Sequence, residues 1–173
     1  MKKPPLIALT AAVLLGLSTQ AKAAVEVQCP GDANGDAVPD SVVNGAPNPE
    51  FRPDVKCMHL TAGDGYIRMG DGRPMYIFGF KDVTGVPSDM VMDDGMLGAS
   101  LPAPTIAVDE GDQFYLTLTN VGMMKRPDLF DPHSVHWHGF PQASAIFDGV
   151  PEASIAVNMG ASLTYYYNVV EPG

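Results

Sequence analysis

The sequence predicts an all-β fold, either a sandwich or a barrel, from three observations. Short runs of β-favouring residues recur from residue 57 to the end of the 173-residue chain. Turn signals that contain glycine or proline separate these runs, and no clear amphipathic helix interrupts them. Residues 114–120 alternate apolar and polar side chains almost strictly, which is typical of a strand with one buried face. Many short strands between such turns are typical of sandwiches and barrels.

The first 23 residues are predicted to be an export signal rather than part of the fold. Lys2 and Lys3 precede an apolar run at residues 6–17, and Ala21-Lys22-Ala23 has the small-x-small pattern of a cleavage site. The apolar run is too short for a stable membrane span, so an uncleaved anchor is the less favoured alternative. The mature protein is therefore expected in the periplasm, at the cell surface or in the medium.

The mature chain is acidic. Without the signal, 7 basic residues remain against 20 acidic ones, which gives a net charge near −13. Such a surface argues against nucleic acid or an anionic membrane as a partner and favours cations, including metal ions. A surface that only keeps the protein soluble explains the charge equally well. About 150 mature residues match the size of one domain.

Residues 24–56 are predicted to be an acidic, loop-rich arm, because they are rich in Gly, Pro, Asn and Asp without periodicity. Four of its side chains occupy positions one, three, five and nine of an EF-hand-like calcium loop: Asp32, Asn34, Asp36 and Asp40. Ala37 replaces the usual turn glycine, and Val43 replaces the bidentate acid. The arm is thus a candidate calcium site, with a turn of solvated aspartates as the alternative.

The two cysteines, Cys29 and Cys57, are expected to form a disulfide, as a cysteine pair in an exported protein usually does. The alternative is a thiolate metal ligand. We disfavour it because neither cysteine lies beside a histidine motif.

The remaining residues, 57–173, carry the predicted strands. Turns are expected at Gly63-Asp64-Gly65, at Asp71-Gly72 and at Glu110-Gly111-Asp112, and a short helical turn at residues 88–97. The strands are expected at residues 57–61, 75–80, 105–108, 114–120, 134–140 and 162–170.

Two histidines within one of these runs, His136 and His138, are the strongest metal-ligand candidates. Side chains alternate faces along a strand, so both imidazoles should project from one side, with Cβ atoms roughly 6.5–7 Å apart. They could hold one metal or one each of two adjacent metals, while Val135 and Trp137 anchor the other face. The alternative is a pair of neutral histidines satisfied by hydrogen bonds.

Other side chains are weaker metal candidates. His133 should face away from the pair and hydrogen-bond near Asp131, and His59 is most simply a core or surface histidine. A loose methionine cluster suits cuprous ion, although methionine more often fills a core: Met90, Met92 and Met96.

Three segments in the same order resemble the multicopper oxidase family of laccases, ferroxidases and cuprous oxidases. Residues 134–140, followed by Asp148-Gly149-Val150-Pro151, are similar to its first copper motif. Residues 102–112 resemble its opening strand and Glu-Gly-Asp turn, with Ala103 at a usual glycine. Residues 159–173 resemble the strand that leads to its second histidine pair. The resemblance is specific over residues 100–173 and weak before them.

The resemblance implies a cupredoxin-like (plastocyanin-like) Greek-key β-sandwich over residues 57–173, incomplete at its C-terminal end. It implies that His136 binds a type 2 copper and His138 a type 3 copper. It also implies that the Asp148 carboxylate assists proton supply, the alternative being a turn-forming Asp-Gly. The family's copper cluster needs eight histidines and this sequence has four, so we expect the amino-terminal part of a larger enzyme, inactive by itself. A sandwich without its last strands has unpaired sheet edges, so we also expect the isolated chain to be poorly soluble or to need a partner segment.

The resemblance further implies that the intact enzyme takes single electrons from a phenol or a metal ion and reduces O2 to water. Its partners would be copper ions, O2 and a reducing substrate, with no nucleic acid and, after signal cleavage, no membrane. One alternative is a stand-alone copper carrier without oxidase activity. Another is a calcium-dependent surface module built on the acidic arm.

Overall fold

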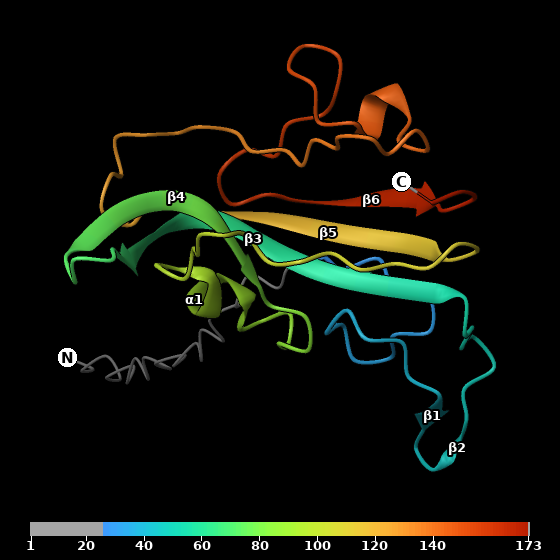
Figure 1. Cartoon of the computed structure of the whole chain (residues 1–173). Helices are drawn as coiled ribbons and strands as arrows, with labels where there is room; N and C mark the ends of the chain where they lie inside the picture. The colour runs from blue at the N-terminus through green and yellow to red at the C-terminus, as the bar shows by residue number, and fades with distance from the viewer. Residues whose placement is uncertain (1–25, 173) are drawn as a thin grey trace, which may run out of the picture.

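The computed structural model describes residues 26–172, and the predicted signal segment 1–23 lies outside them (Figure 1). The regular secondary structure of these residues is mostly strand, with one short α-helix and one 3-10 helix, and the rest is coil and turns. None of the helices in the described part is long and apolar enough to cross a membrane. The elements in chain order are β1 (Val42–Val43), β2 (Ala46–Pro47), β3 (Val55–Arg68), β4 (Pro74–Asp82), α1 (Val91–Gly95), β5 (Gln113–Gly122), η1 (Ala145–Phe147) and β6 (Ser162–Asn168).

A four-stranded sheet in the order β4-β3-β5-β6 forms the centre of the fold. β3 pairs antiparallel with β4 through the turn at Asp71-Gly72, and β5 pairs antiparallel with β6. β3 and β5 run parallel, so the chain must cross over between them, and residues 83–112 with α1 make this crossover. From residue 26 on, the arm contributes the small β1–β2 hairpin and the start of β3, and the predicted disulfide between Cys29 and Cys57 ties it to β3.

The main apolar core lies on the face of the sheet that carries every second residue of β5. Phe114, Leu116 and Leu118 are buried there beside Tyr165 and Tyr167 of β6. The layer that covers this face, here called the coil layer, consists of coil and the short η1, and Figure 1 shows it running along β5 and β6. The residues of this layer that pack into the core come from the histidine motif and from the segments before and after it: Ile106, Val108, Val135, Trp137, Phe140, Ala143, Phe147 and Val157.

The opposite face of the sheet buries polar side chains that bond to one another. The hydroxyls of Thr117 and Thr164 lie 2.8 Å apart, and the Thr119 hydroxyl is 2.8 Å from both His59 Nε2 and Ser162 Oγ. Buried polar groups are costly unless they are paired, so this ladder lets a polar strand face lie inside the protein. α1 packs over part of this face, where Gly95 approaches Thr61 too closely to accept a Cβ atom.

The structure confirms four of the six predicted strands, as β3, β4, β5 and β6, and the short helical turn, as α1. The strands predicted at residues 105–108 and 134–140 are wrong, because both segments are coil. Neither has a neighbouring strand among the described residues, and the coil layer contains only one isolated bridge, between His133 and Val157. An extended segment without a partner forms no ladder.

The turn predicted at Gly63-Asp64-Gly65 is also wrong, because these residues lie inside β3. Instead of forming a turn, Gly63 and Gly65 allow other segments of the chain to lie close to the β3 backbone. A Cβ atom on Gly65 would collide with the backbone of Ala99, and one on Gly63 would lie 2.8 Å from the Val121 side chain. The register between β3 and β5 shifts at Ala62–Gly63, which is typical of a bulge.

Candidate metal centre

The two histidines predicted to bind metal lie side by side on the coil layer. The ring centroids of His136 and His138 are 4.9 Å apart with planes inclined by 69°. Both residues are exposed, and 43% of the His136 side chain is accessible to solvent. The two rings are therefore neighbours that both face solvent. The segment that carries them is not part of a β-sheet.

Aromatic packing holds the motif in place where hydrogen-bonded strands do not. The Trp137 ring lies between the two histidines in sequence and packs inward, 4.9 Å from Phe140 and 5.2 Å from Tyr167 between centroids. Tyr167 stacks in turn on Phe114 of β5 at 6.1 Å. Val135 also packs against the core. The predicted division of the motif into a core side and a ligand side is present.

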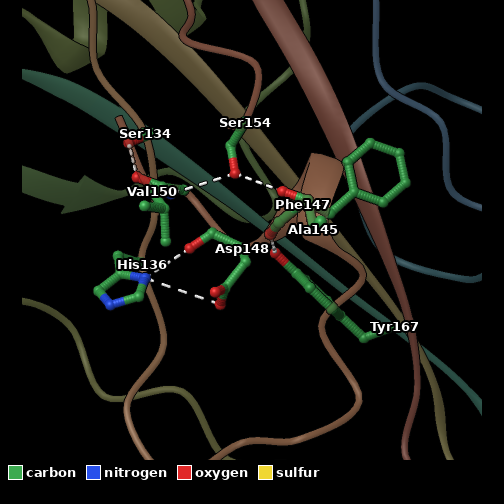
Figure 2. Close-up of polar contacts among 9 residues, drawn as sticks. Ser134, His136, Ala145, Phe147, Asp148, Val150, Ser154 and Tyr167 are labelled. Carbon is green, nitrogen blue, oxygen red and sulfur yellow. Dashed lines mark hydrogen bonds and ion pairs between the residues drawn. The ribbon is translucent and has the colours of Figure 1, made fainter. Parts of the chain in front are cut away.

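The orientation of His136 is set by a hydrogen bond to the loop that follows it. Its Nδ1 lies 2.6 Å from the backbone carbonyl oxygen of Asp148, and Figure 2 shows this contact beside a longer one, 3.6 Å, to the Asp148 carboxylate. A carbonyl can only accept, so the short bond requires the proton on Nδ1. The Nε2 lone pair of a neutral His136 is then available to a metal.

His138 makes no hydrogen bond within residues 26–172, so its ring nitrogens are also open. It borders a pocket of about 470 Å³ between the motif and the segment before β5. The pocket walls combine apolar side chains with carboxylates: Ile106, Val108, Trp137, Phe140, Asp109 and Glu171.

The other two histidines stand apart from this pair. His59 is wholly buried in the sheet, and burial lowers its pKa to about 4. His133 is half-buried, and burial lowers its pKa against the opposing charge of Asp131. The hydrogen bond predicted near Asp131 is absent, since His133 Nε2 is buried without a partner in the described chain.

The donor set fits copper as part of a coordination shell. Imidazole nitrogens are suitable copper ligands, and both rings have nitrogens free to bind. Within residues 26–172 no group of three or more His, Cys, Asp or Glu side chains is arranged to hold a metal ion. A complete shell would therefore need donors beyond this pair.

The candidate calcium loop is organised by its own backbone. Asp32 Oδ1 accepts from the N–H groups of Asn34 and Gly35 at 3.1 and 2.7 Å, and Asp32 Oδ2 accepts from Ala37 at 2.8 Å. Asp36 and Asp40 likewise accept from backbone N–H groups within the loop. These bonds account for the turn without an ion, and calcium binding stays a prediction.

The sequence reasoning missed the residues that hold the loop behind His136. The Tyr167 hydroxyl donates to the Phe147 carbonyl at 2.9 Å. Ser134 Oγ donates to the Gly149 carbonyl at 2.9 Å. Alternation along β6 places Tyr167 on the inner face, but the partner of its hydroxyl depends on the path of a distant loop.

Comparison with known proteins relates the half of the chain that contains His136 and His138 to copper enzymes. The family model described as multicopper oxidase matches residues 86–173, a little more than half of the chain. The multicopper oxidase MmcO of Mycobacterium tuberculosis is 34% identical over 76 residues. That match covers 44% of this chain but only 14% of the relative's length.

Solved multicopper oxidases are similar in fold. The enzyme from Pediococcus acidilactici matches 84% of this chain and 23% of its own, with a TM-score of 0.50 at 19% identity. A blue copper oxidase from Nitrosomonas europaea matches 69% of this chain and 30% of its own, with 29% identity and a TM-score of 0.49. The all-β fold is thus cupredoxin-like, as predicted, and the family-model match shows that the chain belongs to the multicopper oxidase family.

Proposed function

We propose that this chain is the copper-binding amino-terminal domain of an exported multicopper oxidase. The observation that carries the proposal is the pair of adjacent, solvent-facing imidazoles, one of which has its Nδ1 occupied and its Nε2 free. Membership of the family implies copper, O2 and a reducing substrate. The chain spans 14% of the curated relative's length, so the activity of the whole enzyme is part of the proposal.

In this proposal His136 and His138 each supply one imidazole, to a type 2 and a type 3 copper respectively. Copper held there would supply one-electron transfer, by which four electrons from the reducing substrate and four protons would convert one O2 to two waters. Trp137 keeps the two ligands in register by packing into the core. Other parts of the enzyme would provide the remaining ligands.

Asp148 is the proposed proton donor of this chain. Its carboxylate lies 3.6 Å from His136 Nδ1, and 30% of its side chain is accessible to solvent. A carboxyl group in this position can release a proton toward the site and regain one from water. We expect the reducing substrate to be a phenol or a metal ion, the latter favoured by the acidic surface.

Copper content and oxygen uptake, measured on the whole enzyme, test the proposal. We expect bound copper and O2 consumption that depends on an added phenol or on a metal ion such as Fe(II). We expect Asp148→Asn to retain copper and to lower turnover by roughly 10²–10⁴-fold, as loss of a general acid does. Stoichiometric copper binding without any oxygen uptake would instead favour a copper carrier.

A further inference from the structure

Three consecutive backbone carbonyls behind the metal pair each accept a side-chain hydrogen bond from a different part of the chain. Tyr167 of β6 donates to the carbonyl of Phe147, at 2.9 Å. His136 contacts the carbonyl of Asp148, at 2.6 Å. Ser134 donates to the carbonyl of Gly149, at 2.9 Å. Figure 2 shows the three contacts around a single turn of the loop.

We propose that Tyr167 and Ser134 are positioning residues that select the tautomer of His136. By holding the carbonyls on either side, they aim the Asp148 carbonyl at His136 Nδ1 and so leave Nε2 as the metal-binding atom. The proposal deepens the copper-binding function proposed above and rests on it for its purpose. Its test, however, needs no metal.

The choice of tautomer matters because a neutral imidazole carries one proton on either nitrogen. The two nitrogens lie on different sides of the ring, so the tautomer decides where along the segment a metal can bind. An outer hydrogen bond to a metal ligand typically contributes about 10–100-fold in metal affinity. If the Asp148 carbonyl could rotate away from His136 Nδ1, most of this contribution to metal affinity would be lost.

The loop is built so that this carbonyl has little freedom. Gly149 adopts φ +70°, and its Cα lies so close to the backbone of Val135 and His136 that a Cβ atom would collide with it. Ser154 Oγ closes the loop on its other side, accepting from Val150 N–H at 3.1 Å and donating to the Ala145 carbonyl at 2.6 Å.

Tyr167 is the most firmly fixed of these donors. Its ring is wholly buried between Phe114, Trp137 and Phe140, and burial raises the pKa of its hydroxyl, so the group remains a donor at neutral pH. The bond it makes to the Phe147 carbonyl therefore ties the loop to the rigid sheet.

The main competing explanation is that the Asp148 carboxylate, not its carbonyl, selects the tautomer. The distances favour the carbonyl, since 2.6 Å is a hydrogen bond and 3.6 Å to the carboxylate is not. Changing the Asp148 side chain separates the two explanations, because the tautomer should stay the same if the carbonyl selects it and should shift if the carboxylate does.

The experiment records the histidine tautomers of the metal-free full-length protein, labelled with ¹⁵N-histidine, by long-range ¹H–¹⁵N correlation where the ring is neutral. His136→Gln assigns the signal. We expect wild-type His136 to be predominantly the Nδ1–H form, with Tyr167→Phe and Ser134→Ala each shifting it toward a mixture. Asp148→Asn should leave it unchanged. Tyr165→Phe is the matched control, since Tyr165 is equally buried on β6 and its hydroxyl has no hydrogen-bond partner within the described residues, while the variant keeps the ring contact with Phe147.

The proposal is overturned if both Tyr167→Phe and Ser134→Ala keep the wild-type tautomer, or if Asp148→Asn shifts it as much as they do. If Tyr167→Phe fails to fold, Ser134→Ala decides the question alone. A wild-type protein with the expected tautomer that binds no copper would refute the proposed function and leave this inference standing.

Discussion

The buried sheet and the coil layer place histidine in opposite environments. His59 on β3 is wholly buried, hydrogen-bonded to Thr119, and burial lowers its pKa to about 4. His136 on the coil layer is exposed, and the one hydrogen bond that it makes within residues 26–172 leaves a ring nitrogen free. The same residue type is thus a fixed structural group in one layer and an available ligand in the other.

The difference follows from how each layer satisfies its backbone. In the sheet, β3 and β5 are hydrogen-bonded along both edges, and the covering layer and α1 pack on its two faces, so side chains such as His59 are buried away from solvent. The coil layer has almost no ladder, so it is held by aromatic anchors and by side-chain bonds to its carbonyls. This arrangement leaves the outward side chains accessible, as a ligand site requires.

The largest expected effect is on copper binding. Replacing both His136 and His138 by alanine should abolish copper binding at the pair, because it removes the ligands themselves and not only their outer contacts. His59→Gln is the control from the buried layer and should leave copper affinity unchanged. Titration with Cu(II) in competition with a chelator measures both. A loss of affinity in His59→Gln as large as in the double variant would contradict the comparison.

The second effect concerns acid stability and belongs to the sheet. The pKa of His59 is about 4 in the folded protein and 6.5 unperturbed, so between these pH values the unfolded chain binds a proton that the folded chain does not. Stability contributed by neutral His59 is complete above pH 6.5 and is lost as the pH falls toward 4, by about 3 kcal/mol in total. Urea unfolding of wild type and His59→Gln across this range should show a pH-dependent difference between them. Parallel curves would contradict it.

A third, smaller effect compares two glycines of the coil layer. Gly149 and Gly160 have similar φ values, +70° and +79°, but only Gly149 lies against another backbone. Gly160→Ala should cost roughly 1–2 kcal/mol for the left-handed conformation alone. Gly149→Ala should cost more and should also weaken copper binding, since it displaces the Asp148 carbonyl. Thermal unfolding and copper titration test this, and equal losses in both variants would argue against a tightly packed loop.

The smallest effect is expected in the acidic arm. Asp32→Ala removes hydrogen bonds that its carboxylate accepts from exposed or part-buried loop amides, and water can replace the carboxylate at these amides. The melting temperature should fall by a few degrees or less, because the disulfide still ties the arm to β3. A calcium-dependent rise in the wild-type melting temperature that Asp32→Ala abolishes would establish the calcium site. No response to calcium would leave the loop as a simple turn.

Regular secondary structure was predictable where the signal is local. The alternation of residues 114–120 predicted β5, and Asp71-Gly72 predicted the β3–β4 turn. The failures arose where a residue's role depends on distant contacts. Gly63 and Gly65 suggested a turn but serve close packing against Val121 and Ala99, which no local pattern encodes.

The candidate site was predictable in its ligands but not in its support. The spacing of His136 and His138 indicated two neighbouring imidazoles, and they are neighbours. The strand expected to align them does not form, and packing of Trp137 replaces it. The bond from His136 to the Asp148 carbonyl spans 12 positions and depends on the path of the loop. The sequence therefore indicated a role for the Asp148 side chain but not for its backbone carbonyl.

The most direct test of the copper-ligand assignment is a crystal structure of the copper-loaded protein with anomalous data collected at the copper absorption edge. The account predicts an anomalous peak at coordination distance from His136 Nε2 and copper bound to a ring nitrogen of His138, with Nδ1 of His136 still bonded to the Asp148 carbonyl. Copper at His136 Nδ1, or no copper near either ring, would contradict it.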